Sequence, residues 1–240
     1  MSRWHEDPAQ VRPMLASLDA PPTTAKGFLY EPKYDGIRAI VDLRPPARQG
    51  GTPTVSIYSR NGREKHVQFP EIVDALTKVA ARLDAPVVLD GEIVAIDAKG
   101  KPLGFQQIQG RIHLTGAGEI ARAAVQHPSA IILFDVLRDG AEDLRGQPLA
   151  ARRITLQQRI KPSAAVARVV RLSEVALDDG RQMLARARAE GWEGLIVKDG
   201  QSVYQSGRRT PAWRKMKLLK QQEFVIGGWT EPRQSRQHFG

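Results

Sequence analysis

Short apolar runs outnumber amphipathic helical stretches in this chain of 240 residues, and the two kinds of segment do not alternate regularly. A doubly wound parallel sheet requires such alternation, so the pattern favours an α+β fold with antiparallel sheets. The apolar runs predict strands within 28–43, around a polar corner, and at 55–58, 130–137, 194–197, 213–219 and 223–229. Apolar spacing of three and four residues predicts helices over 70–83, 150–160 and 178–190.

The charge balance and the lack of cysteine limit the classes of function. The chain has 36 lysines and arginines against 26 aspartates and glutamates, for a net charge of +10, which favours a polyanionic partner. A basic surface that merely keeps the protein dissolved is the alternative. Without cysteine there is no disulfide, no thiolate metal site and no cysteine nucleophile. No apolar run could cross a bilayer and the amino terminus lacks a signal-peptide core, so we expect a soluble intracellular protein with no membrane partner.

Lys33 lies where an expected strand ends, in the segment 31–38 (EPKYDGIR). The chain has neither a G-x-x-x-x-G-K-[ST] loop nor a G-x-G-x-x-G motif after a strand, so a nucleotide would be held in another way. An ordinary lysine has a pKa of about 10.4, so only roughly one in a few thousand is neutral at pH 7, and a nucleophilic amine needs neighbours that lower this value. Asp35 could orient the amine or place a metal, Gly36 would let backbone approach a ligand, and Arg38 offers a fork of donors to phosphate or sugar. The alternative is a solvated lysine in a turn.

Charged residues also stand at the end of one apolar strand and inside a second apolar region. Arg60 follows the expected strand 55–58. Asp90 and Glu92 lie within the apolar region 87–96, where a carboxylate is costly unless it binds a cation or accepts hydrogen bonds. For Glu92, the alternative is a position at a strand edge that faces water.

Two further charged segments follow in the carboxyl-terminal third. Glu193 and Lys198 stand at the two ends of the apolar strand 194–197. Lys215 and Lys217 are two residues apart on an expected strand and therefore share a face. Such a pair could bind a triphosphate and lower the pKa of a nearby lysine, whereas the alternative is a basic, exposed strand face.

Together these segments resemble the motifs of the covalent nucleotidyltransferases, which are DNA ligases, RNA ligases and mRNA capping enzymes. They match, in order, K-x-D-G-x-R (33–38), D-G-E (90–92), the strand that carries Phe134-Asp135 (130–137), E-G-x-x-x-K (193–198) and K-x-K (215–217). Softer similarity at 12–16, 105–109 and 223–232 is closest to bacterial ATP-dependent DNA ligases, especially the ligase module of end-joining enzymes. The resemblance implies two antiparallel sheets flanked by helices, the ATP-grasp-like fold of an adenylation domain.

The resemblance also implies a mechanism and roles. Lys33 would attack the α-phosphate of ATP, expel pyrophosphate and carry AMP, which would pass to the 5′-phosphate of a DNA nick before the 3′-hydroxyl displaces it. The residues that would contact the nucleotide are Glu31, Tyr34, Arg38, Glu92, Phe134, Lys198, Lys215 and Lys217. Arg60 would contact the 5′-phosphate of the nick. The ligands of magnesium or manganese would be Asp35, Glu92 and Glu193. For Phe134 the alternative is a plain core aromatic.

The implied partner is nicked double-stranded DNA, and a Ku-like end-binding protein is a further candidate partner. The protein would be a monomer in the bacterial cytoplasm, associated with the nucleoid. The implied organisation is a lead-in over 1–26, which reads as irregular, an adenylation domain over 27–220 and the start of an oligonucleotide-binding (OB) domain over 221–240. About twenty residues follow Lys217, too few for a five-stranded barrel. We therefore expect the OB-fold domain to be missing, with slow self-adenylation and poor nick sealing by the chain alone.

Two other readings stay open at this point. An RNA ligase or a capping-type guanylyltransferase would use the same chemistry at Lys33 with RNA or GTP. A non-catalytic DNA-binding module would only bind phosphate groups. It would not require buried carboxylates at Asp90 and Glu92.

Overall fold

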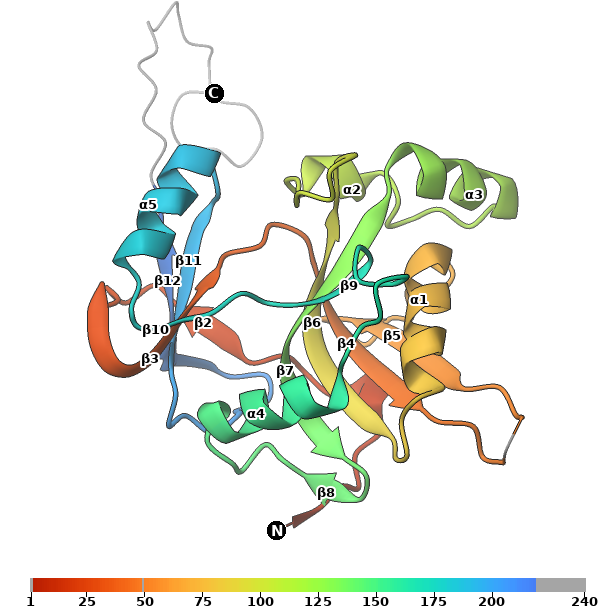
Figure 1. Ribbon diagram of the computed structural model, residues 1–240, viewed down its shortest axis with the longest axis horizontal. Helices are drawn as coiled ribbons and strands as arrows, with labels where there is room; N and C mark the ends of the chain where they lie inside the picture. Colours follow the sequence, from red (N-terminus) through yellow and green to blue (C-terminus); the bar gives the residue numbers. More distant parts are fainter. Residues whose placement is uncertain (1, 49, 219–240) are drawn as a thin grey trace, which may run out of the picture.

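Two β-sheets form the frame of the protein in a computed structural model that describes residues 2–48 and 50–218 (Figure 1). Within these residues a large sheet of seven strands has the order β1-β8-β7-β6-β4-β5 with β9 beside β7, and a small sheet of five has the order β10-β3-β11-β12-β2. The strands are β1 (Ser2–Arg3), β2 (Leu15–Ser17), β3 (Thr24–Pro32), β4 (Ile37–Arg44), β5 (Thr54–Ser59), β6 (Val87–Ala95), β7 (Ser129–Asp139), β8 (Glu142–Asp143), β9 (Val170–Leu172), β10 (Ala176–Asp179), β11 (Gly194–Asp199) and β12 (Arg209–Lys217). All pairs are antiparallel except β12 with β2 and β7 with β9.

The described helices are η1 (Pro8–Gln10), α1 (Pro70–Ala80), α2 (Gln106–Gln109), α3 (Ala117–Gln126), α4 (Leu149–Arg159) and α5 (Arg181–Glu190). Helix α1 begins at Pro70, whose fixed φ and missing N–H suit the first turn of a helix. Ile72, Leu76 and Val79 recur every three or four residues and are buried against the large sheet.

The two sheets share an apolar core, and α5 covers the small sheet on its other side (Figure 1). Between the sheets, Ile40 and Val88 of the large sheet are buried in one cluster with Trp213 of the small sheet. Leu184 of α5 is buried in a separate cluster with Leu195 of β11. The layers are therefore α1, the large sheet, the small sheet and α5.

A fully buried ion pair joins α4 to the large sheet. Arg152 of α4 donates from Nε and Nη2 to the two carboxylate oxygens of Asp135 on β7, both at 2.8 Å. Neither side chain is exposed to solvent. Arg152 also donates to the backbone carbonyls of Gln147 (2.5 Å) and Ser202 (3.1 Å). One side chain thus ties a helix, a strand and two loops together.

The predicted fold class is confirmed, and the three predicted helices correspond to α1, α4 and α5. Helix α5 begins at Arg181, later than predicted, because residues 176–179 pair with β3 as β10. The helices α2 and α3 were not predicted, since α2 has four residues and α3 buries only Ile120. The lead-in 1–26 is not irregular throughout, because β1 joins the large sheet, β2 joins the small sheet and β3 already begins at Thr24.

Two sequence-based predictions fall outside the described residues. They are the strand 223–229 and the start of an OB domain over 221–240. Over residues 2–48 and 50–218, no helix is long and apolar enough to cross a membrane.

Candidate active site

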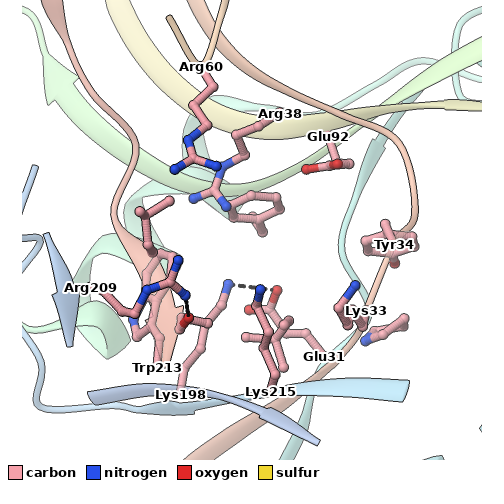
Figure 2. A pocket seen from close by; sticks show the side chains of 15 residues that line it. Glu31, Lys33, Tyr34, Arg38, Arg60, Glu92, Lys198, Arg209, Trp213 and Lys215 are labelled. Carbon is pink, nitrogen blue, oxygen red and sulfur yellow. Dashed lines mark hydrogen bonds and ion pairs between the residues drawn. The ribbon is translucent and has the colours of Figure 1, made fainter. Parts of the chain in front are cut away.

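A cavity of about 230 Å³ lies between the two sheets beside Lys33. Six lysine or arginine side chains line it against two glutamates, so it suits a ligand with several negative charges. Figure 2 shows Arg60, Arg38 and Glu92 on one side, across from Lys198, Lys215 and Arg209. Nine residues predicted from the sequence line the cavity: Glu31, Lys33, Tyr34, Arg38, Arg60, Glu92, Phe134, Lys198 and Lys215.

Strand register explains how the small sheet brings distant residues to this cavity. Ile196 of β11 pairs with Glu31 of β3 on one side and with Lys215 of β12 on the other. Two residues along β11, Lys198 pairs with Trp213. Residues directly opposite one another, or two apart on a strand, point to the same face of a sheet. The five side chains therefore form one wall.

Lys33 directly follows β3, as predicted for a strand exit. Its backbone N–H donates to the carbonyl of Gly194 (2.9 Å), which fixes the corner against β11. The side chain is 14% exposed, and its ammonium forms an ion pair with the carboxylate of Glu193. The amine is thus held at the edge of the cavity in contact with a group that can accept a proton.

Arg38 is fixed by a buried network on the large sheet. It pairs directly with Glu92 in the register of β4 and β6. Its Nε and Nη2 donate to the two oxygens of Asp90 at 2.6 and 2.7 Å, and Asp90 also accepts from the hydroxyl of Tyr204 at 2.5 Å. Burial alone would lower the pKa of Arg38, but Asp90 outweighs burial and the pKa is raised. The sequence-based requirement that buried Asp90 find a cation is therefore met by Arg38.

Phe134 reaches the cavity from a β-bulge. Asp90 pairs with Asp135, whereas the next residue of β6, Gly91, pairs with Leu133, so Phe134 is the extra residue on β7. The centre of its ring lies 4.6 Å from the guanidinium carbon of Arg38. Phe134 therefore forms part of the cavity wall and is not solely a core aromatic.

Glu31 and Lys198 form a second buried ion pair in the wall. Lys198 Nζ donates to Glu31 Oε2 at 2.9 Å, and the two side chains are 3% and 2% exposed. Burial lowers the pKa of Lys198, and Glu31 opposes this. The ammonium lies 4.3 Å from the ring centre of Phe134 and 4.4 Å from that of Trp213. Glu31 Oε1 is buried and lies 3.9 Å from Arg153 Nη1, but it accepts no hydrogen bond from the part of the chain described, so it can accept one from a ligand.

Glu92 has a strongly perturbed carboxyl group. Burial raises its pKa from the ordinary 4.5 to about 7, although Arg38 acts in the opposite direction. Glu92 lies on β6, between β7 and β4, so it is not the water-facing edge residue considered as the alternative.

Protein stability is expected to fall as the pH rises from about 4.5 to about 7, because the folded protein keeps the proton on Glu92 while the unfolded chain releases it. Glu92→Gln removes this contribution, so the variant should gain stability relative to the parent above pH 7. The gain should be up to about 3 kcal/mol, since one pKa unit is worth about 1.4 kcal/mol. Urea unfolding between about pH 5 and pH 8 measures it. Parallel pH profiles for the two proteins would contradict the assignment.

Three predicted residues, Asp35, Glu193 and Lys217, line a second cavity of about 880 Å³ that shares Lys33 with the first. Asp35 does not orient the lysine amine, because its carboxylate accepts the backbone N–H of Phe105 at 3.0 Å. Lys215 and Lys217 alternate along β12 as predicted, but each lines a different cavity.

The predicted metal ligands Asp35, Glu92 and Glu193 are not gathered into one cluster. Among the described residues, no group of three histidine, cysteine, aspartate or glutamate side chains could hold a metal ion. The reason is their placement, since Glu92 faces the first cavity and the other two face the second. The structure therefore does not gather the three into a preformed site, and their role as metal ligands stays a prediction.

Gly36 serves the large sheet. A Cβ atom at this position would lie 2.1 Å from the carbonyl oxygen of Ile93. Glycine at this position therefore lets the backbone of residue 36 pack closely against β6. The sequence suggested instead that it lets the backbone approach a ligand.

Three functional residues were missed by the sequence analysis. Arg209 and Trp213 line the cavity, and Tyr204 supports Asp90. Arg209 and Trp213 lie at even spacings from Lys215 on one strand, so alternation along β12 was a usable signal. Tyr204 had no such signal, because its partner is 114 residues away.

Comparison with known proteins decides the family. The model of the ATP-dependent DNA ligase domain matches residues 13–217. The chain belongs to this family. The resemblance inferred from five short motifs is thereby confirmed.

Curated relatives carry ligase and end-joining names. A probable DNA ligase of Streptomyces coelicolor is 32% identical over 220 residues, which are 90% of this chain and 41% of that protein. The multifunctional non-homologous end joining protein LigD of Pseudomonas aeruginosa is 34% identical over 233 residues, 97% of this chain and 25% of that protein. The chain thus spans less than half the length of these relatives.

Solved structures of ligase domains share the fold. A mycobacterial DNA ligase D complexed with ATP and MES is 31% identical, with a TM-score of 0.66 over 92% of this chain and 64% of that one. The ligase domain of Mycobacterium tuberculosis LigD is 30% identical, with a TM-score of 0.64 over 87% and 60%. The two-sheet arrangement is therefore that of a ligase adenylation domain.

Proposed function

We propose that this chain is the nucleotide-transfer core of an ATP-dependent DNA ligase, with residues 27–220 as its catalytic domain. The observation that carries the proposal is the position of Lys33, a strand-end amine in contact with Glu193 at the edge of a cation-rich cavity. A surface that only binds phosphate would need neither this amine nor the pairing of Arg38 with the buried carboxylate of Asp90.

Each part of ATP has a suitable place in the cavity walls. Phe134 and Ile196 line it from different sheets and offer apolar surface to a flat purine ring. The free oxygen of Glu31 suits the 6-amino group of adenine. Arg38 and Glu92, paired across two strands, suit the ribose hydroxyls.

The phosphates would meet the remaining cations. Burial lowers the pKa of Lys215, and repulsion from Lys33, Arg209 and Lys217 lowers it further. Phosphate bound beside Lys215 would offset the repulsion that this lysine experiences from the three other cations in the free protein. Tyr34 and Lys198 complete the proposed set of nucleotide contacts.

The amine of Lys33 would attack the α-phosphorus of ATP. The Lys33 ammonium first passes a proton to Glu193, which leaves a neutral amine. A nitrogen–phosphorus bond then forms, the bond from that phosphorus to the pyrophosphate oxygen breaks, and the second nitrogen proton leaves to solvent. Positioning and neutralisation of charge then supply most of the catalysis, as in other phosphoryl transfers.

Magnesium fits this site as an ion that arrives with the nucleotide. It takes oxygen ligands from phosphates and from only one or two carboxylates, so one carboxylate beside the phosphates is enough. Either Glu193, next to Lys33, or Glu92, in the first cavity, would hold the ion together with phosphate oxygens, and the ion would supply neutralisation of phosphate charge. Manganese prefers the same kind of ligands and would serve as well.

Nicked double-stranded DNA is the proposed second substrate. Arg60 and Arg209 are exposed and line the cavity, so they suit the 5′-phosphate of the nick that takes over AMP. The 3′-hydroxyl would then displace AMP and close the strand. The names of the LigD relatives favour a role in end joining. We therefore propose that a Ku-like end-binding protein recruits this protein, which acts as a monomer at the bacterial nucleoid.

Labelling from the α-phosphate separates this function from its rivals. With magnesium present, the label should stay covalently on the protein after incubation with ATP and not with GTP. Retention from GTP would favour a guanylyltransferase, and preferential sealing of nicked RNA would favour an RNA ligase. Retention from neither nucleotide would overturn the proposal.

Loss of the 6-amino group from ATP is expected to reduce adenylation of the protein by roughly 10- to 100-fold. Glu31 Oε1 then accepts no hydrogen bond from the nucleotide, and a hydrogen bond to a charged group is worth about 1.5–3 kcal/mol. In Glu31→Ala the two nucleotides should react alike. The comparison uses purine riboside triphosphate and ATP on both proteins. A 6-amino preference that survives in the variant would show that another group recognises adenine.

A further inference from the structure

Three arginines without carboxylate partners lie on segments that also carry Leu15, Arg60 and Arg209 of the cavity wall. Arg12, Arg63 and Arg208 are exposed, and none forms an ion pair with any described residue. Arg12, Arg63 and Arg208 therefore keep their charge for another molecule.

Backbone contacts hold the three arginines on adjoining segments. The carbonyl of Arg12 accepts the N–H of Gly207 (2.8 Å), and the carbonyl of Arg208 accepts the N–H of Leu15 (2.8 Å), which lines the cavity. Arg63 lies in the turn that also carries Arg60, since its carbonyl accepts the N–H of Ser59 at 2.8 Å. We call Arg12, Arg63 and Arg208 the arginine rim.

Gly62 packs that turn tightly against Arg12. It has a φ of +76°, and a Cβ there would lie 2.3 Å from the carbonyl oxygen of Ala9 and 2.9 Å from Arg12 Nη1. Arg12 Nη1 donates to Ala9 at 3.0 Å, so the guanidinium is anchored at one nitrogen while its other donors make no hydrogen bond with the described residues. The nearby Glu64 forms no ion pair with an arginine of the described residues, and its carboxylate lies 3.7 Å from His66 Nδ1.

We propose that the arginine rim binds backbone phosphates of duplex DNA next to the nick, while Arg60 and Arg209 receive the nick phosphate itself. This proposal rests on the proposed function only for the location of the nick. Successive phosphates along one strand are spaced by about 3.4 Å of helix axis, so a duplex that enters at the cavity mouth presents further charges to the neighbouring loops. Because the rim lines neither cavity, its contacts are with the DNA and not with ATP.

The test compares two triple variants of equal charge in the full 240-residue chain. One is Arg12→Gln/Arg63→Gln/Arg208→Gln. The control changes Arg82, Arg122 and Arg188 to glutamine, which are also exposed and form no ion pair within the described residues, but lie beside or on α1, α3 and α5. Binding of a fluorescent nicked DNA duplex is measured over a series of salt concentrations.

Loss of the rim should reduce the slope of log affinity against log salt by roughly 2 to 3, since each lost phosphate contact removes about 0.9. The control triple should change the slope far less. Equal losses in the two variants, an unchanged slope in the rim variant, or no salt-dependent binding by the parent chain would each overturn the proposal. So would tighter binding of an RNA duplex than of the DNA duplex.

A separate measurement distinguishes failure of the rim from failure of the proposed function. Both variants should still take AMP onto Lys33 from ATP and magnesium without DNA, because the rim touches no part of the nucleotide cavity. If the parent chain takes up no AMP, the proposed function fails, while the salt slopes still decide whether the rim binds DNA. If only the rim variant loses AMP uptake, the rim belongs to the nucleotide site and the proposal is wrong.

Discussion

Lys33→Ala is expected to abolish the attachment of AMP to the protein, with no residual product at a second lysine. The neighbouring cations Lys198 and Lys215 lie on other strands of the small sheet and would still bind the phosphates. Neither follows the corner after β3 nor forms the ion pair with Glu193 that Lys33 forms. Intact-protein mass spectrometry after incubation with ATP and magnesium measures the AMP increment.

Two control variants make this result specific to the amine. Lys33→Arg keeps the positive charge but should also carry no AMP, because a guanidinium stays protonated and is not a nucleophile at ordinary pH. Lys99→Ala, in the wall of the second cavity, should be adenylated like the parent. An AMP increment that persists in Lys33→Ala would place the nucleophile elsewhere and remove the basis of the proposed mechanism.

The charged residues of the site could be predicted because they break an otherwise apolar pattern. A carboxylate inside the run 87–96 must find a partner or a ligand, and this requirement is visible in the sequence alone. Asp90 met it through Arg38.

The pairing of these residues could not be predicted, because strand register sets it over long separations. Lys33 and Glu193 are 160 residues apart, and Glu31 and Lys198 are 167 apart. The bulge that turns Phe134 toward the cavity depends on one extra residue in β7, which no local pattern marks. For the same reason, the sequence could not show that Asp35 and Glu92 face different cavities.

Buried arginines were a further feature hidden from the sequence. The run 150–160 has helical spacing, and arginines in such a helix are normally solvated. In the structure Arg152 and Arg153 of α4 are both buried, and Arg153 donates to the carbonyls of Phe134 and Ser173 at 3.1 and 3.0 Å. The helix thus supports the strand behind the site through charges as well as through apolar contacts.

Removal of the Arg152 side-chain charge is therefore expected to be the most destabilising single change away from the cavity. Arg152→Met would leave the carboxylate of Asp135 without an ion-pair partner among the described residues and without exposure to solvent. It would also leave the carbonyls of Gln147 and Ser202 without that donor. Breaking a buried pair by removing one partner costs about 3–5 kcal/mol, which corresponds to a fall in melting temperature of roughly 10 °C for a domain of this size. Thermal and urea unfolding measure the change.

An exposed pair in the same protein supplies the matched control for this prediction. Arg181 and Asp179 are bonded in a similar two-point geometry, with closest contacts of 2.6 Å, but their side chains are 71% and 43% exposed. Water and salt replace such an interaction, so Arg181→Met should leave the melting temperature unchanged within error. The contrast between the two substitutions separates the effect of burial from that of geometry. If both variants unfold like the parent, the charge on Asp135 is not buried in solution and the link between α4 and β7 is weaker than the structure indicates.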